Sequence, residues 1–318
     1  MNQSIVEYVR EQVVIDLFGP GKTFTTTMNE HWLSEIRSHI PIKTANNFYN
    51  LGDHLSDVFR SSSSGRTQSS VSGGGAAWES LICWYLNLCL INTRTVVVKT
   101  NKHKPTIIKK AMTVKYGNVE SNSENDLVAI TFPDKIEYRE DKNVINITNQ
   151  DTGDHVPLKR TPRSKKYNLI PILDALMTRD FVDTEIAILQ LKTNWNDNAQ
   201  IPMLWDMVYA ANGVPNRNIY VGTHTYNPQT CKNFSYSFIT VPTNNLEQFT
   251  PTATAVERVT NLSGGNFWGY PSQNGIATNI KDIIQRNFRD NTFANNSYTQ
   301  NFNNALQHLN STFSYFNY

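Results

Sequence analysis

The pattern of apolar positions predicts helices over the first 60 residues. Apolar residues recur there at intervals of three and four, in two successive segments: Ile5, Val6, Val9, Val13, Val14 and Leu17, then Trp32, Leu33, Ile36 and Ile40. Residues at these intervals form one face of a helix. We therefore expect residues 1–60 to form an N-terminal helical region.

A change of composition follows at residues 61–75 (SSSSGRTQSSVSGGG). Serine and glycine lose much conformational entropy when they become ordered. This segment is therefore expected to be a loop, either flexible or ordered by a ligand. From Ala76 to Leu86 the residues are strong helix formers with apolar side chains all round, which predicts a buried helix. Glu79 lies in its first turns.

Short β-branched or apolar runs predict strands at 95–99, 127–132, 185–192 and 218–223, and a helical pattern at 201–211 separates the last two. This order predicts an α/β fold with a mixed central sheet and helices against it. Beyond Pro242 the chain is rich in Asn, Thr, Ser and Gln with aromatic residues, and one helix is expected at 276–288. We interpret 241–318 as an accessory region for DNA recognition or dimerisation.

Composition places the chain among folded enzymes rather than disordered or membrane proteins. Of its 318 residues, 39 % are hydrophobic and 11 % aromatic, which is enough for a large core. The longest apolar stretch, 81–91, is shorter than the ~20 residues of a membrane span. The N-terminal residues lack the features of a secretory signal, so a cytoplasmic location is expected.

The sequence lacks the motifs of common metal sites and of serine hydrolases. The three cysteines have no metal-ligand spacing, the seven histidines form no HExxH motif, and there is no Gly-x-Ser-x-Gly elbow. The segment Gly19-Pro20-Gly21-Lys22-Thr23 imitates the end of a phosphate-binding loop. However, the first glycine of that motif would fall at Asp16, and a helix rather than a strand precedes it.

The strongest candidate site combines two predicted strands. Gln190 and Lys192 are two positions apart, so their side chains point to the same face of strand 185–192. A lysine near the end of an apolar strand needs a carboxylate, a phosphate or a metal-bound water as partner. Asp126, at the start of strand 127–132, converges with both residues if the two strands are neighbours. The alternative is an ordinary turn aspartate and an exposed strand-end lysine.

These residues resemble the motif of the PD-(D/E)XK nuclease superfamily, which includes many Type II restriction endonucleases. The resemblance covers roughly residues 76–225 and rests on Glu79 in the helix, Asp126 opening one strand and Gln190-Leu191-Lys192 on the next. It implies a restriction-endonuclease-like α/β/α core. It also implies that Mg²⁺ is held by Asp126 and Gln190, with a contact from Glu79, and that Lys192 positions or deprotonates the attacking water.

The motif departs from the family pattern in three ways. Gln190 replaces the usual acid, Asn125 rather than proline precedes Asp126, and 64 positions separate Asp126 from Gln190, which implies a long insertion. A literal Pro-Asp occurs at Pro133-Asp134, so Asp134 is the rival metal ligand. Asp126 is preferred because an alternating apolar strand follows it.

A basic run lies within the insertion, which we place at 150–182. Five cations occupy eight positions beside Tyr167: Lys159, Arg160, Arg163, Lys165 and Lys166. Such a run suits DNA phosphates, and its alternative is a solvated loop. Asn194 and Asn196 follow Lys192, where their amides suit contacts to DNA or the capping of the next helix.

The expected protein is a Type II restriction endonuclease with a catalytic core at 76–240, which cuts double-stranded DNA at a short sequence. The resemblance implies a homodimer and a cognate DNA methyltransferase in the same cell, and the twofold symmetry of DNA sites favours the dimer. Two alternatives remain open. One is a nuclease on the same core with a repair or modification-dependent role, and the other is a DNA-binding protein without catalysis.

Overall fold

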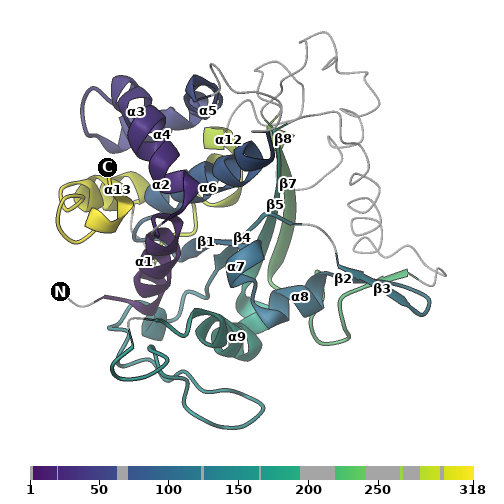
Figure 1. The fold of residues 1–318 in the computed structure, drawn as a ribbon. Coiled ribbons are helices and arrows are strands. Elements are labelled where there is room, and N and C mark those ends of the chain that lie inside the picture. Colours follow the sequence, from purple (N-terminus) through teal and green to yellow (C-terminus); the bar gives the residue numbers. More distant parts are fainter. Residues whose placement is uncertain are drawn as a thin grey trace.

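A computed structural model describes residues 3–19, 21–62, 71–122, 125–164, 166–193, 219–240, 266–267, 280–293 and 297–318. These residues form a mixed α/β structure in which a helical N-terminal region precedes the strands and two further helices follow them (Figure 1). The helix predicted at 201–211 lies outside the described residues.

The N-terminal helical region is confirmed. Its elements are α1 (Ile5–Leu17), α2 (Thr23–Thr27), the π-helical turn η1 (Met28–Trp32), α3 (Leu33–His39), α4 (Ala45–Asn50), η2 (Leu51–Asp53) and α5 (Leu55–Ser61). The Ser4 hydroxyl caps α1 by accepting from the Glu7 N–H at 3.2 Å. Apolar residues at helical spacing, such as Val9, Val13 and Ile36, are fully or almost fully buried.

The buried helix carrying Glu79 begins earlier than predicted. Helix α6 spans Val71–Cys89, so residues 71–75 of the predicted Ser/Gly-rich loop are helical, and residues 63–70 lie outside the described part. Three successive glycines cost about 1 kcal/mol each in a helix. Each residue added to an existing helix gains a backbone hydrogen bond without a new nucleation step, which favours extension of the buried helix through this segment.

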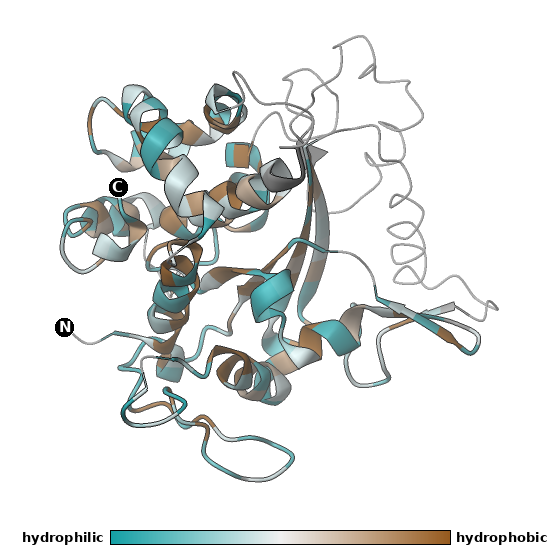
Figure 2. Ribbon diagram, in the orientation of Figure 1, coloured by the Kyte–Doolittle hydropathy of each residue, from teal (hydrophilic) through white to brown (hydrophobic). Residues whose placement is uncertain are grey.

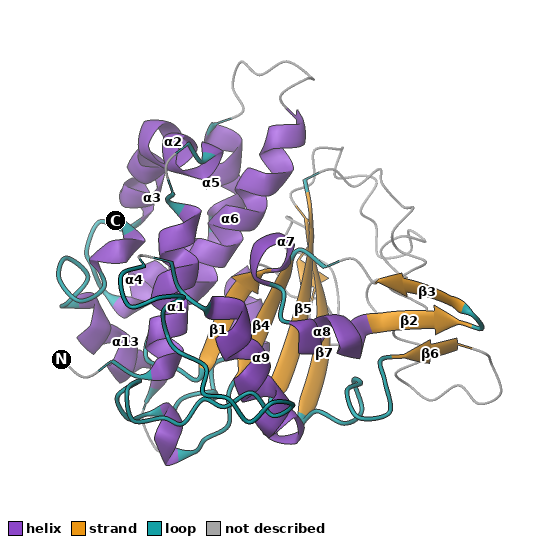
Figure 3. Cartoon of the chain, turned by 60° about the horizontal axis from the view of Figure 1, so that its bottom comes forward, coloured by secondary structure: helices purple, strands orange, loops and turns teal. Residues whose placement is uncertain are grey.

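The central sheet has five strands in the order β1 (Thr95–Lys99), β4 (Leu127–Thr131), β5 (Glu185–Lys192), β7 (Asn233–Thr240) and β8 (Asn266–Phe267). The β1–β4 and β4–β5 pairs are antiparallel, whereas β5–β7 and β7–β8 are parallel. Figure 3 shows β1, β4, β5 and β7 side by side. The predicted mixed sheet is confirmed, and β1 and β5 have the predicted bounds.

Two strands differ from the prediction. Strand β6 (Ile219–Val221) lies where a strand was expected, but it belongs to a second sheet of order β3-β2-β6, with β2 (Thr113–Tyr116) and β3 (Val119–Asn122). Its place beside β5 is taken by β7, which the sequence pattern did not predict. Polar residues alternate with aromatic ones in β7, and Ser237 is nevertheless fully buried.

Helices lie on both sides of the central sheet. Figure 3 shows α9 (Leu169–Asp180) in front of the strands, together with α7 (Thr100–His103) and α8 (Thr106–Met112). On the other face, Lys99 of β1 contacts α6, and the Ser237 hydroxyl of β7 accepts from Asn287 at 3.4 Å. Asn287 ends α12 (Ile280–Asn287), which lies within the helix predicted at 276–288.

The C-terminal residues form part of the core rather than a separate unit. Helix α13 (Tyr298–Leu306), which was not predicted, and η8 (Ser314–Phe316) pack against the N-terminal helices. The Trp84 indole of α6 donates to the Phe316 carbonyl at 2.9 Å. Figure 2 shows the hydrophobic residues concentrated in α6, α9 and the central strands. Within the described residues, no helix is long and apolar enough to cross a membrane.

The outer edge of the sheet is closed by a side chain. The Asn87 carboxamide of α6 donates to the Val97 carbonyl at 2.7 Å and accepts from the Val97 N–H at 3.1 Å. Asn87 is fully buried and thus makes the pair of bonds that a further strand would make. The three cysteines are reduced and buried, as expected of core thiols.

Candidate functional site

The strand register brings Asp126 beside Gln190. Leu127 pairs with Leu189 in the antiparallel β4–β5 ladder, so the residue before Leu127 lies across from the residue after Leu189. Asp126 Oδ2 accepts from the Leu191 N–H at 2.7 Å, and the Asp126 N–H donates to the Leu189 carbonyl at 3.3 Å. The condition for convergence, that these two strands are neighbours, is therefore met.

Gln190 has an unusual environment for an amide. Its side chain is in a residue only 1 % exposed, and neither Oε1 nor Nε2 has a hydrogen-bond partner within the described part of the chain. A buried polar group without a partner costs about 1–3 kcal/mol. Functional sites are where such costs are retained, because a ligand supplies the missing partner. Other buried polar atoms, such as Trp78 Nε1 and Tyr236 Oη, also lack a partner, so what distinguishes Gln190 is its position across from Asp126.

Lys192 completes the group on the same face of β5. It lies two residues after Gln190 at the last position of the strand and is half-buried. Its strand partner in the parallel β5–β7 pair is Thr240, the last residue of β7. The ends of β5 and β7 and the beginning of β4 thus meet at one end of the sheet, with a carboxylate, an amide and an ammonium group.

Glu79 has a different partner from the one expected. Its carboxylate forms an ion pair with Lys99 at 2.9 Å, and Lys99 Nζ also donates to the Ala76 carbonyl at 3.1 Å and to Ser80 Oγ at 3.0 Å. Lys99 pairs with Leu127, which pairs with Leu189, so its side chain lies on the face opposite to Gln190. Lys99 was missed, although it is also a lysine at the end of an apolar strand.

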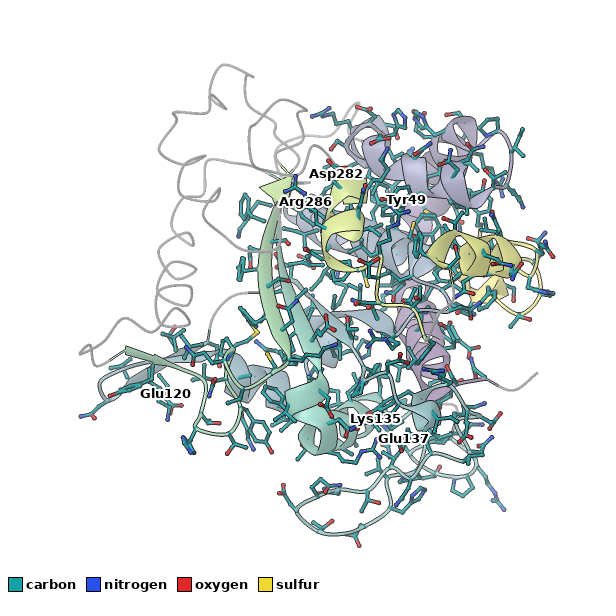
Figure 4. All side chains as sticks on the ribbon, turned by 180° about the vertical axis from the view of Figure 1, so that it is seen from behind. Tyr49, Glu120, Lys135, Glu137, Asp282 and Arg286 are labelled. Carbon is teal, nitrogen blue, oxygen red and sulfur yellow. The ribbon has the colours of Figure 1, made fainter. Side chains whose placement is uncertain are left out.

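Asp134 lies at the wrong end of β4 to join this group. It follows Thr131, which pairs with Glu185 at the beginning of β5, and its carboxylate bonds to Arg139. Figure 4 shows the neighbouring Lys135 at the lower end of the molecule, with Asp282 and Arg286 of α12 at the upper end. The geometry therefore favours Asp126 over Asp134 as the partner of Gln190.

The basic loop also lies away from the candidate site. Its segment leaves β4 at the Thr131 end, and it packs on the beginning of α1, where the Tyr8 hydroxyl donates to the Leu158 carbonyl at 3.1 Å. Lys159, Arg160, Arg163 and Lys166 are exposed there. The loop, which we expected to bind DNA phosphates, is therefore at the other end of the sheet from Asp126 and Gln190. Lys165, Asn194 and Asn196 lie outside the described residues.

A second set of basic residues lies at the same end of the sheet as Asp126 and Gln190. It follows β1 directly and comprises Lys102, His103, Lys104, Lys109 and Lys110. The Thr100 N–H, at the start of this segment, donates to the Asp126 carbonyl at 3.0 Å. The sequence signal was present as the run Lys102-His103-Lys104. Its proximity to Asp126 depends on the antiparallel β1–β4 pairing, which the run alone does not reveal.

The donor set suits a hard cation with few protein ligands. No cluster of three or more His, Cys, Asp or Glu side chains occurs among the residues that the structure describes. The oxygens at the site are those of the Asp126 carboxylate and the Gln190 amide. Mg²⁺ is commonly held by one or two protein groups, with waters and substrate phosphates as its other ligands. The residues present therefore fit Mg²⁺.

The sequence matches no model of a known protein family and no curated protein.

Proposed function

We propose that this protein is a magnesium-dependent DNA endonuclease of the PD-(D/E)XK type, with a restriction-endonuclease-like core. The observation that carries the proposal is the buried Gln190 amide, which has no hydrogen-bond partner among the described residues and lies directly across from Asp126 in the β4–β5 pair. The chain order also supports it, because a helix with Glu79, a strand opened by Asp126 and the adjacent strand with Gln190-Leu191-Lys192 occur as the resemblance implies.

In this proposal each residue has one role. The Asp126 carboxylate and the Gln190 amide oxygen would hold Mg²⁺, and the Leu191 N–H keeps the carboxylate oriented through its 2.7 Å bond. A bound Mg²⁺ would supply charge compensation for the scissile phosphate. The Lys192 ammonium positions the attacking water or donates a hydrogen bond to a phosphate oxygen. Glu79 is left out of the ligand set because Lys99 holds it.

The proposed substrate is double-stranded DNA cut at a short specific sequence, as in Type II restriction. Each chain carries a single Asp126–Gln190–Lys192 group, whereas a duplex has two strands to cut. A twofold homodimer supplies one group for each strand of a twofold-symmetric site. A cognate methyltransferase in the same cell would then protect the host's own sites.

The test is digestion of unmethylated plasmid and phage DNA by the purified protein, in Mg²⁺ or in EDTA. Discrete Mg²⁺-dependent fragments are expected from the unaltered protein and none from Asp126→Ala or Lys192→Ala. Two matched controls lie at the other end of the same strands: Asp134→Asn after β4, and Lys232→Gln, which removes an exposed ion pair with Glu185. Both should cleave normally.

The outcomes separate the alternatives. Cleavage that appears only on modified DNA would favour a modification-dependent nuclease over restriction. DNA binding that persists in EDTA without any product would favour a binding protein in which Gln190 has replaced the catalytic acid. Cleavage that is indifferent to both Asp126→Ala and Lys192→Ala would overturn the assigned site.

A further inference from the structure

A small cavity of about 170 Å³ lies at the end of β1, between α1, α2, α6 and α7. Its polar lining includes Asp16 from α1, Lys22 at the beginning of α2, Lys99 at the end of β1, and Lys102 and His103 from α7. The chain thus brings four cationic or potentially cationic side chains to one carboxylate. Lys22 lies close over Gly19, where an added Cβ would be 3.2 Å from Lys22 Cε.

The charges in this cavity are not balanced. Asp16 Oδ2 lies 3.2 Å from His103 Nε2, 3.8 Å from Lys102 Nζ and 3.9 Å from Lys22 Nζ. The two ammonium groups are therefore too far from this oxygen for a hydrogen bond. Since Lys99 is neutralised by Glu79, a single carboxylate faces two permanent positive charges and a histidine among the described residues that line the cavity. An excess of positive charge remains, and an anion would compensate it.

Asp16 is ionised at neutral pH, so it counts as a full negative charge in this balance. The hydrogen bond from His103 is the largest effect on the pKa of Asp16 and lowers it, with help from the charges of His103 and Lys102. Partial burial acts in the opposite direction but is outweighed. The positive excess remains after Asp16 is counted.

The cavity is connected to the candidate site through β1. Lys99 lines the cavity and is the last residue of β1, and the next residue, Thr100, donates its N–H to the Asp126 carbonyl at 3.0 Å. Lys102 and His103 follow within the same short helix, which Figure 2 shows as hydrophilic. The side chains of Lys22 and Lys102 are 31 % and 41 % exposed. A phosphate that is part of a longer DNA strand can therefore reach them from the solvent.

We propose that Lys22, Lys102 and His103 form a phosphate subsite that holds a backbone phosphate of the DNA at the end of β1. This inference rests on the proposed function. A backbone phosphate fits better than a small free anion, because the cavity is open and Lys104, Lys109 and Lys110 continue the positive surface along the same segment. In this proposal Lys22, in the turn at Gly21-Lys22, binds a phosphate. It does so as a single side chain, and the segment does not form the phosphate-binding loop that its sequence imitates.

The test is the anisotropy of a fluorescent DNA duplex, titrated with protein in EDTA at several salt concentrations. The double variant Lys22→Gln/Lys102→Gln keeps the aliphatic stems and removes two charges. We expect binding about ten-fold weaker at low salt, with the slope of log K against log salt reduced by roughly 1.8, since each phosphate contact contributes about 0.9. The matched control, Lys43→Gln/Lys232→Gln, removes two charges from exposed lysines that line neither the cavity nor the basic loop, and it should change neither quantity.

A second variant tests the sign of the effect. Asp16→Asn removes the one negative charge but keeps an acceptor for His103, so DNA binding should become tighter. Thermal unfolding of each variant serves as the folding control. Unchanged binding by the double lysine variant, equal losses in the control variant, or weaker binding by Asp16→Asn would each overturn the subsite.

The outcome is independent of cleavage. Lysine-dependent binding by a protein that never cleaves would support the subsite and refute the nuclease. Cleavage with lysine-independent binding would do the reverse. Stabilisation by inorganic phosphate that requires Lys22 and Lys102, without any effect of these lysines on duplex binding, would show a site for free phosphate and would also overturn the proposal.

Discussion

At the scale of single residues, the most informative side chain is that of Gln190. Neither of its polar atoms has a hydrogen-bond partner among the described residues. The sequence predicted that Asp126, Gln190 and Lys192 converge, because a strand has a period of two and a buried lysine needs a partner. It could not predict the Lys99–Glu79 ion pair, which depends on how closely α6 approaches the end of β1. The two lysines at strand ends look alike in sequence, and only the packing of a helix distinguishes them.

Replacing Gln190 by leucine should separate stability from function. Leucine fills a similar volume without polar atoms, so the cost of the unpaired amide disappears and the metal-free protein should gain about 1–3 kcal/mol. Urea unfolding in EDTA measures this change, and plasmid digestion should show no cleavage. A loss of stability in Gln190→Leu would contradict the view that the amide lacks a protein partner.

At the scale of elements, strand prediction succeeded where the runs are apolar and failed where polar residues are buried. Strand β7 was missed because Asn233, Ser235 and Ser237 interrupt its aromatic residues, whereas the structure buries Ser237 against Asn287 of α12. The pattern at 218–223 was read correctly as extended, but a local pattern does not reveal which sheet a strand joins. That choice depends on long-range pairing, here of Tyr116 with Ile219.

The contact between α6 and β1 leads to a prediction about Asn87. Its carboxamide satisfies both backbone groups of Val97 and is fully buried, so Asn87→Ala leaves an N–H and a carbonyl without partners. We expect a loss of about 2–4 kcal/mol in the free energy of unfolding, measured with urea. Asn101→Ala, on the exposed surface of α7, is the control and should change stability by less than about 0.5 kcal/mol. If Asn87→Ala lost as little stability as this control, water would have replaced the amide as the partner of Val97.

At the scale of the whole molecule, a buried carboxylate of α9 joins this helix to residues 135–138, which follow β4 at the lower end of the sheet. Asp180 accepts hydrogen bonds of 2.7 Å from Lys135 and Tyr138, and its other partner is Arg179 at 2.7 Å. Burial alone would raise the pKa of Asp180, but the hydrogen bonds from Lys135, Arg179 and Tyr138 outweigh it and hold this pKa below its usual value. Folding is therefore linked to the ionisation of this group.

The sign of the linkage predicts the pH dependence of stability. The unfolded chain binds a proton at Asp180 near pH 3.9, above the pKa in the folded state. The contribution is thus complete above about pH 4 and is lost as pH falls through the folded pKa. Asp180→Asn should lower the thermal midpoint at pH 7 and reduce its decline below pH 4. Asp183→Asn, whose carboxylate is half-exposed beside Lys135, should leave that decline almost unchanged. An equal decline in all three proteins would refute the assignment.

The closed edge at Asn87 also has a consequence for assembly. β1 is the outer strand of the central sheet, and its Val97 groups are occupied by Asn87, while the nearby Arg94 N–H donates to the Asn291 carbonyl at 2.9 Å. A second copy of the chain therefore finds no backbone partner at Val97, the middle residue of this edge. Extension of the sheet across β1 by another chain is hindered at this point, which helps to protect chains crowded together during synthesis from edge-to-edge aggregation on this side.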